Sequence, residues 1–166
     1  MNQNKEAKQL QAALALLRIT LGVIILATWF DNLQKDLYTA EGLNGFLSWL
    51  FDAQNGNASS LAFYKSFLYS TIMPIAGPFS TIQMIVEFLL GLTLLLGLFT
   101  RLAGFIAMFF FVNLFLSYFG GHEWIWVYVL LFMSALTTSL GAAGRRWGLD
   151  QWVLKKHGSS PVAIAC

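Results

Sequence analysis

The sequence predicts an all-α integral membrane protein, an integral membrane four-helix bundle that forms a single membrane domain over residues 1–166. Two observations carry this prediction. Of the 166 residues, 57% are hydrophobic and only 11% are charged, whereas soluble domains carry about 25% charged residues. Four apolar runs also approach the roughly 20 residues that a membrane-spanning helix needs; they are residues 12–30, 79–99, 102–119 and 124–140.

The first predicted helix carries one charged side chain, Arg18, about one and a half turns inside the apolar run. Helical spacing places Arg18, Gly22, Ile25 and Trp29 on one face. A long arginine stem can reach the headgroup level of the membrane, which would make Arg18 an anchor at the inner surface. The alternative is that Arg18 is a buried partner for a carboxylate or a ligand.

Residues 31–78 are predicted to form a long outer loop between the first two membrane helices. A loop of this length usually has structure of its own. Residues 42–51 are apolar on one side, and residues 61–73 are rich in aromatic side chains. Both segments suit short helices at the outer membrane interface. The prolines at 74 and 78 mark the boundary with the next membrane helix.

The second predicted membrane helix contains one carboxylate, Glu87, well inside its apolar run. A charged side chain at that depth costs roughly 2.5–3.5 kcal/mol, so it usually has a partner or a function. Glu87 shares a stripe with three polar or small residues, and the stripe is expected to face protein and not lipid. Its other members are Ser80, Gln83 and Gly91.

The third predicted helix places Asn113 at a depth similar to that of Glu87, counted from the outer ends of the two helices. We therefore expect Gln83, Glu87 and Asn113 to group together. Phe109 and Phe110 lie one turn below Asn113. The fourth predicted helix begins near two tryptophans, which are typical of a membrane interface.

The basic residues predict the orientation in the membrane. Most of them lie before the first helix, between the second and third helices, or after the fourth, whereas the long loop carries more acidic than basic side chains. This distribution predicts that the N- and C-termini, including the tail at residues 141–166, are cytoplasmic. We expect a multi-pass protein of a bacterial-type inner (plasma) membrane, in contact with the lipid bilayer and with no nucleic-acid partner. The basic residues outside the long loop are Lys5, Lys8, Arg18, Arg101, Arg145, Arg146, Lys155 and Lys156, and those within it are Lys35 and Lys65.

The sequence contains no haem, flavin or metal motif. It lacks glycine-rich phosphate loops and paired cysteines, and Cys166 is its one cysteine. A single cysteine forms neither an internal disulfide nor a four-cysteine metal site. Electrons for any redox reaction would therefore come from a substrate or from a partner subunit.

Four segments resemble the DoxX/DoxD family of small four-helix membrane proteins. They are residues 17–22, residues 86–92 around Glu87, residues 95–101 ending in Arg101, and residues 144–150 ending in Asp150. The long outer loop is more similar to the DoxD branch, which the resemblance describes as the large subunit of a thiosulfate:quinone oxidoreductase. Family members often carry a glycine and a lysine near the outer end of the first helix. Here Lys35 is the nearest base to that position.

Two functions are compatible with this resemblance. The first is an accessory, structural subunit of a larger electron-transfer or oxidoreductase complex, with other membrane or redox subunits as partners. Its polar side chains would then hold the helices together. The second is a quinone-binding subunit, in which Glu87 is the catalytic proton carrier. Asn113 and Gln83 would bind the quinone, and Trp29, Phe109 and Phe110 would flank its ring.

Overall fold

The computed structural model describes residues 3–157 and 164–166, and all regular secondary structure in these residues is helical. Part of the predicted tail, residues 158–163, lies outside the described residues. The helices are α1 (Gln3–Gln34), α2 (Ala40–Leu50), α3 (Ala62–Phe67), the π-helical turn η1 (Leu68–Ile72), the 3-10 turn η2 (Met73–Ile75), α4 (Ala76–Leu96), α5 (Thr100–Tyr118), α6 (Trp126–Leu140), the 3-10 turn η3 (Ala143–Arg145) and α7 (Asp150–His157).

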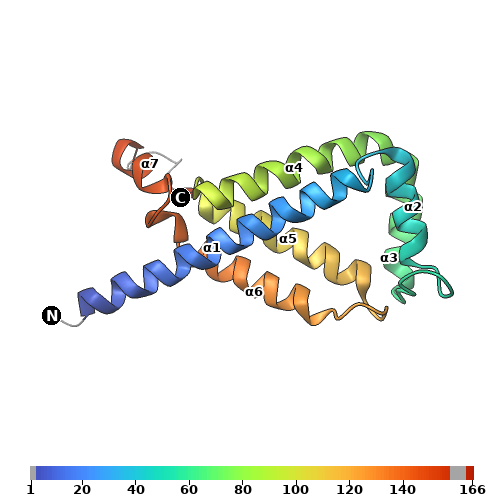
Figure 1. Ribbon diagram of the computed structural model, residues 1–166, viewed down its shortest axis with the longest axis horizontal. Coiled ribbons are helices and arrows are strands. Elements are labelled where there is room, and N and C mark those ends of the chain that lie inside the picture. The colour runs from blue at the N-terminus through green and yellow to red at the C-terminus, as the bar shows by residue number, and fades with distance from the viewer. Residues whose placement is uncertain (1–2, 158–163) are drawn as a thin grey trace.

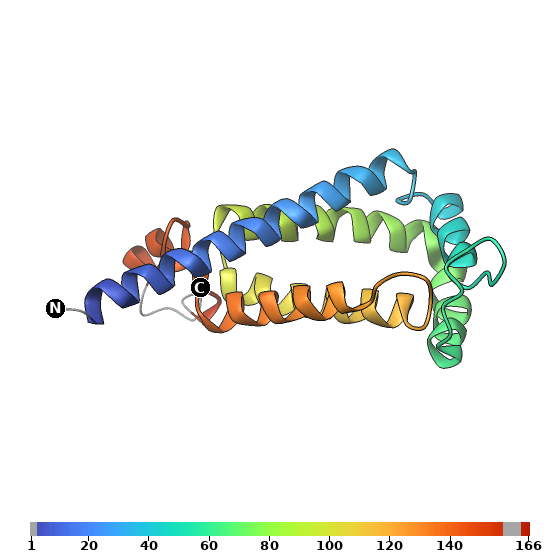
Figure 2. The ribbon, with the colours of Figure 1, turned by 60° about the horizontal axis from the view of Figure 1, so that its bottom comes forward.

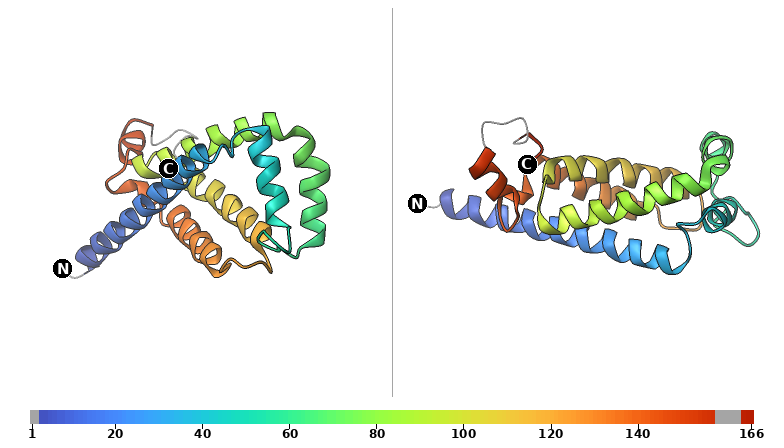
Figure 3. Two further views of the ribbon diagram at one scale, coloured as in Figure 1. Left: turned by 45° about the vertical axis from the view of Figure 1, so that its right-hand side comes forward. Right: turned by 90° about the horizontal axis from the view of Figure 1, so that it is seen from above.

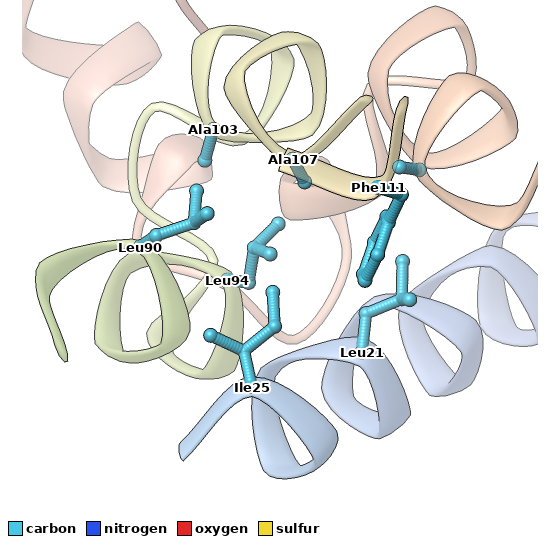
Figure 4. Close-up of a cluster of buried hydrophobic side chains, with 8 residues drawn as sticks. Leu21, Ile25, Leu90, Leu94, Ala103, Ala107 and Phe111 are labelled. Carbon is cyan, nitrogen blue, oxygen red and sulfur yellow. The ribbon is translucent and has the colours of Figure 1, made fainter. Parts of the chain in front are cut away.

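The long helices α1, α4, α5 and α6 run back and forth beside one another (Figures 1 and 2). Helix α1 packs mainly on α4, and α5 packs mainly on α6. All four helices contribute to one apolar core, which Figure 4 shows in part. Its buried members are Leu21, Ile25, Leu90, Leu94, Ala103, Ala107, Phe111 and Ala135.

Three of the helical segments are long and apolar enough to cross a membrane: Asn4–Gln34, Ala62–Leu96 and Thr100–Tyr118. Helix α6 is apolar but has only 15 residues. At 1.5 Å per residue it is about 22 Å long, which is shorter than the roughly 30 Å of a bilayer's hydrocarbon core. The structure therefore supports a membrane protein with three evident spans and one shorter apolar helix.

The predicted outer loop is mostly helical, as expected, but its boundaries differ from the prediction. Helix α1 continues to Gln34, so the first loop residues extend the membrane helix. The helical segment continues through the prolines at 74 and 78, because a π-helical turn and a 3-10 turn connect α3 to α4. Pro74 lies in the first turn of η2, where a missing N–H group costs little.

Helices α2 and α3 lie across one end of the bundle, which we call the loop end (Figure 3). Helix α2 begins at the cap residue Thr39, whose side chain accepts a hydrogen bond of 3.0 Å from Gly42 N. Leu43, Leu47 and Leu50 form its buried face and pack in a second core with residues of α3 and η1. This core covers the loop end of the bundle.

The loop between α2 and α3 is fastened to the turn between α5 and α6 by a buried residue, Asn57. Its carbonyl oxygen accepts a hydrogen bond of 3.0 Å from His122 N, and its Oδ1 accepts one of 3.2 Å from Glu123 N. Asn57 is only 2% exposed. Its side chain is therefore a structural link, although residues 57–59 fit a glycosylation pattern.

Helices α1 and α4 approach one another most closely at Gly22. A Cβ atom at this position would lie 2.6 Å from Leu95 N and 3.0 Å from Gly91 O, both of which are backbone atoms. Small residues permit such close helix contacts in membranes. The predicted face of Arg18, Gly22, Ile25 and Trp29 does pack on α4.

Substitution of Gly22 tests this close contact. Gly22→Ala should destabilise the protein by about 1–3 kcal/mol, because the two backbones must separate to admit a methyl group. The matched control is Gly45→Ala in α2, where nothing lies within 4 Å of the added atom. Denaturant unfolding in mixed micelles measures both variants. Equal stability of Gly22→Ala and Gly45→Ala would contradict the close packing of α1 on α4.

Candidate functional site

Glu87 lies near the middle of α4 and is 2% exposed. Its Oε1 accepts a hydrogen bond of 3.1 Å from Gln83 Nε2, one turn earlier in the same helix. Its Oε2 accepts a hydrogen bond from the Tyr38 hydroxyl and lies 3.4 Å from Asn32 Nδ2. Three donors from three segments therefore converge on one buried carboxyl group, which we call the Glu87 cluster.

Two of these donors lie beyond the first membrane helix as predicted, which ended at residue 30. Asn32 is in the last turns of α1, and Tyr38 is in the short connection between α1 and α2. Asn32 stands near the end of the first helix, in the region where the resemblance implied a glycine and a lysine. Lys35 makes instead an exposed ion pair of 2.6 Å with Asp31.

Tyr38 connects the Glu87 cluster to the chain that crosses the loop end. The residue is 9% exposed. Burial, followed by the hydrogen bond to Glu87 and the charge of that group, raises the pKa of the Tyr38 phenol well above its ordinary value of 10.0. The phenol therefore remains a hydrogen-bond donor to Glu87 throughout the neutral pH range.

Asn113 is not part of the Glu87 cluster. Its Oδ1 accepts a hydrogen bond from the Tyr64 hydroxyl of α3, and its carbonyl oxygen accepts one of 2.8 Å from Ser117 Oγ. The expected grouping of Gln83, Glu87 and Asn113 is therefore only half correct. Glu87 is the twelfth residue of α4 counted from the loop end, whereas Asn113 is the sixth residue of α5 counted from that end. Each is bonded to a different tyrosine, Tyr38 for Glu87 and Tyr64 for Asn113.

Of the three predicted aromatic side chains, Trp29 is hydrogen-bonded to the helix that carries Glu87. Trp29 Nε1 donates a hydrogen bond of 3.0 Å to Met84 O, and its ring lies 5.0 Å from that of Phe88. Phe109 is 63% exposed on the outside of α5. Phe110 is half-buried against the bundle core. The structure therefore does not gather the predicted quinone-flanking residues around Glu87.

A shallow apolar groove lies between α5 and α6, on another part of the bundle. It has a volume of about 180 Å³ and is open to the side. Tyr128 supplies the hydroxyl group among its side chains, and none of the lining residues belongs to the Glu87 cluster. The lining residues are Phe111, Val112, Phe115, Tyr128, Val129 and Phe132.

The opposite end of the bundle, which we call the tail end, is built around a second buried charge. Arg18 is fully buried and does not reach the membrane surface as an anchor. Its Nη1 donates to Leu94 O at 2.6 Å and to Leu95 O at 2.9 Å. Its Nη2 donates to Trp147 O at 3.0 Å. The partners of Arg18 are thus backbone carbonyl groups, among them those at the C-terminus of α4, where a positive charge is favoured.

Asp150, the last residue of the predicted tail motif, is also fully buried. Its two carboxylate oxygens accept hydrogen bonds of 2.6 Å from Phe99 N and 3.0 Å from Thr100 N, at the start of α5. Arg101, predicted to mark the inner end of the second membrane helix, lies in the first turn of α5. The amides of Arg101 and Leu102 donate to Ala165 O at 3.1 and 3.3 Å. Residues of the tail thereby satisfy the free N–H groups at the N-terminus of α5.

Cys166 is buried beside Asp150. Burial, followed by a hydrogen bond with Asp150, raises the pKa of the Cys166 thiol to about 11. Because the thiolate is the reactive form, Cys166 should react slowly with alkylating reagents at neutral pH.

Replacement of Tyr38 tests the Glu87 cluster. Tyr38→Phe removes one of three donors and should cost about 1–3 kcal/mol. Because the folded-state pKa of Tyr38 is raised, its contribution is complete below pH 10.0 and is lost as the pH rises further. The variant should therefore lose less stability than the wild type in strong alkali. Tyr69→Phe, at an exposed tyrosine, should keep the wild-type pH dependence, and an unchanged profile in Tyr38→Phe would refute the linkage.

Replacement of Asp150 tests the tail end. Asp150→Ala leaves two helix-terminal N–H groups without acceptors and should cost about 1–2 kcal/mol. The same change lowers the thiol pKa of Cys166, so maleimide labelling at neutral pH should become faster. Asp31→Ala, which breaks an exposed ion pair, should change neither property. Labelling at the wild-type rate in Asp150→Ala would show that Asp150 does not hold the tail.

The comparisons with known proteins agree with the resemblance noted in the sequence. No solved structure matches the chain. A family model described as "TQO small subunit DoxD" matches residues 13–165. The family is thus described as the small subunit, which corrects the expectation of a large subunit. With nearly its whole length matched, the chain belongs to the DoxD family.

Proposed function

We propose that this chain is an accessory membrane subunit of a thiosulfate:quinone oxidoreductase-type complex. The observation that carries the proposal is the enclosure of Glu87. The donors around its carboxyl group come from Tyr38, Gln83 and Asn32 and are all directed at Glu87 itself. A carboxyl group in this setting fastens the loop end to α4, because both of its oxygens accept hydrogen bonds from protein side chains.

The charge distribution supports a four-span topology with both termini in the cytoplasm. Arg145, Arg146, Lys155 and Lys156 all follow α6 at the tail end, where α1 also begins (Figure 1). In bacterial plasma membranes such clusters stay on the cytoplasmic side. In this topology α6 crosses the membrane despite its length, and α2 and α3 lie on the outer surface.

The family description supports a partner subunit as the source of the redox chemistry. A small subunit acts with at least one other chain, and the loop end offers exposed aromatic side chains to such a chain. Phe63 is 65% exposed and Phe67 is 46% exposed on α3, and Trp49 is 41% exposed on α2. Exposed aromatic residues of this kind are enriched in protein interfaces.

The alternative is a quinone-binding subunit with Glu87 as proton carrier. A quinone needs an apolar slot beside a hydrogen-bond donor and a proton source. The groove between α5 and α6 is an apolar slot of about 180 Å³, but Glu87 does not line it. The apolar slot and the buried carboxyl group therefore lie in two different places, which makes the accessory function the better-supported one.

Glu87→Gln separates the two functions. The amide keeps the size of the side chain but loses one of its acceptor oxygens. We expect the variant complex to be less heat-stable, yet to reduce quinone at the wild-type rate per assembled complex. The measurement uses the native complex, purified in mild detergent through a tag on this chain, with assembly followed by size-exclusion chromatography.

The control is Asp52→Asn, which makes the same chemical change in an exposed turn. It should affect neither assembly nor turnover. The accessory function would be rejected if Glu87→Gln assembled with wild-type heat stability but lost thiosulfate-dependent quinone reduction.

A further inference from the structure

The tail end has a basic cleft between the N-terminal part of α1 and the η3 turn. The cleft has a volume of about 350 Å³. Three of its six lining residues are cationic, and none is acidic. We call it the basic cleft, and its lining residues are Asn4, Ala7, Lys8, Gln11, Arg145 and Arg146.

The basic cleft contains polar atoms whose bonding is incomplete. Arg146 Nη1 donates a hydrogen bond of 2.8 Å to Lys8 O, which joins the two walls. Arg146 Nε and Gln11 Oε1 are buried and lack a hydrogen-bond partner among the described residues. A buried N–H group of a guanidinium without an acceptor calls for an anion or a water molecule. Because a side-chain amide can rotate, Gln11 can also turn its NH₂ group toward an anion.

The surroundings of the basic cleft indicate that such an anion comes from the membrane. The guanidinium of Arg146 lies 5.1 Å from the ring centroid of Trp147, which is 54% exposed. Leu140, at the end of α6, is 73% exposed. An exposed tryptophan beside an arginine, such as Trp147 beside Arg146, is typical of the headgroup level of a membrane. An exposed leucine at the end of an apolar helix, such as Leu140, is typical of the edge of the hydrocarbon region. The cleft thus opens at the depth of lipid phosphates.

We propose that the basic cleft binds the phosphate headgroup of an anionic phospholipid from the leaflet at the tail end. Arginine and lysine side chains between helices recognise such headgroups by charge and by hydrogen bonding. The bound phosphate would join the N-terminal part of α1 to the η3 turn. This would add a lipid contact beside the backbone hydrogen bonds of Arg18 and Asp150.

The test measures lipid binding to the full chain purified in mild detergent, by native mass spectrometry and by titration. The probes are dioleoyl phosphatidylglycerol, dioleoyl phosphatidylcholine and inorganic phosphate. The cleft variant is Lys8→Gln with Arg145→Gln, because both side chains are exposed and their loss leaves the Arg146 hydrogen bond in place. The control is Lys155→Gln with Lys156→Gln, which removes the same charge from the exposed side of α7.

We expect the cleft variant to bind phosphatidylglycerol about tenfold more weakly or worse, and the control to bind it nearly as well as the wild type. Phosphatidylcholine should bind weakly to all three proteins, and inorganic phosphate should not displace the anionic lipid. Equal losses in both variants would show diffuse surface attraction and overturn the proposal. Equal binding of the two lipids, or displacement by inorganic phosphate, would overturn it as well.

Discussion

The fold depends on the hydrogen bonds that satisfy the backbone carbonyl and N–H groups at the turn between α4 and α5. This turn brings four carbonyl groups from the end of one helix and four N–H groups from the start of the next to the same end of the bundle. Arg18 takes the carbonyls of Leu94 and Leu95. The tail amides of Leu149 and Asp150 take those of Leu96 and Gly97, at 3.1 and 2.9 Å.

The free N–H groups at the start of α5 donate hydrogen bonds to residues of the same tail. Asp150 accepts two of them through its carboxylate, and Ala165 accepts the next two through its carbonyl oxygen. An unsatisfied backbone group in a membrane costs several kcal/mol. The tail is therefore part of the bundle's structure, and it explains why a polar segment after the last apolar helix folds back onto the turn between α4 and α5.

Periodicity predicted the faces of the helices well but not their partners. In the predicted stripe of Ser80, Gln83, Glu87 and Gly91, Gln83 is half-buried and the other three are buried. Gly22 and Ile25 contact α4, as helical spacing implies. Tyr38 and Ala165 lie in irregular segments, which have no periodicity to read. Depth counting placed Asn113 beside Glu87, but α4 begins at Ala76, three residues before the predicted start, and α5 ends at Tyr118, so Glu87 is farther from the loop end than Asn113. The hydrogen-bond partners of Glu87 and Asn113 are instead two tyrosines of the loop end, Tyr38 and Tyr64.

Three of the segments that carry the family resemblance have a structural role at the tail end. Gly97 has a φ of 69° and leaves room for the Arg18 guanidinium, and a Cβ at Gly148 would lie 2.9 Å from Gly97 O. With Arg18 and Asp150, these glycines permit the tail to close on α4 and α5. At the loop end, Glu87 has a similar role, because its hydrogen bond with Tyr38 holds the connection between α1 and α2 against the bundle. The two buried charged residues thus secure opposite ends of the α1–α4 pair. Because both side chains are held by hydrogen bonds within the bundle, residue similarity to the family reports first on a shared fold.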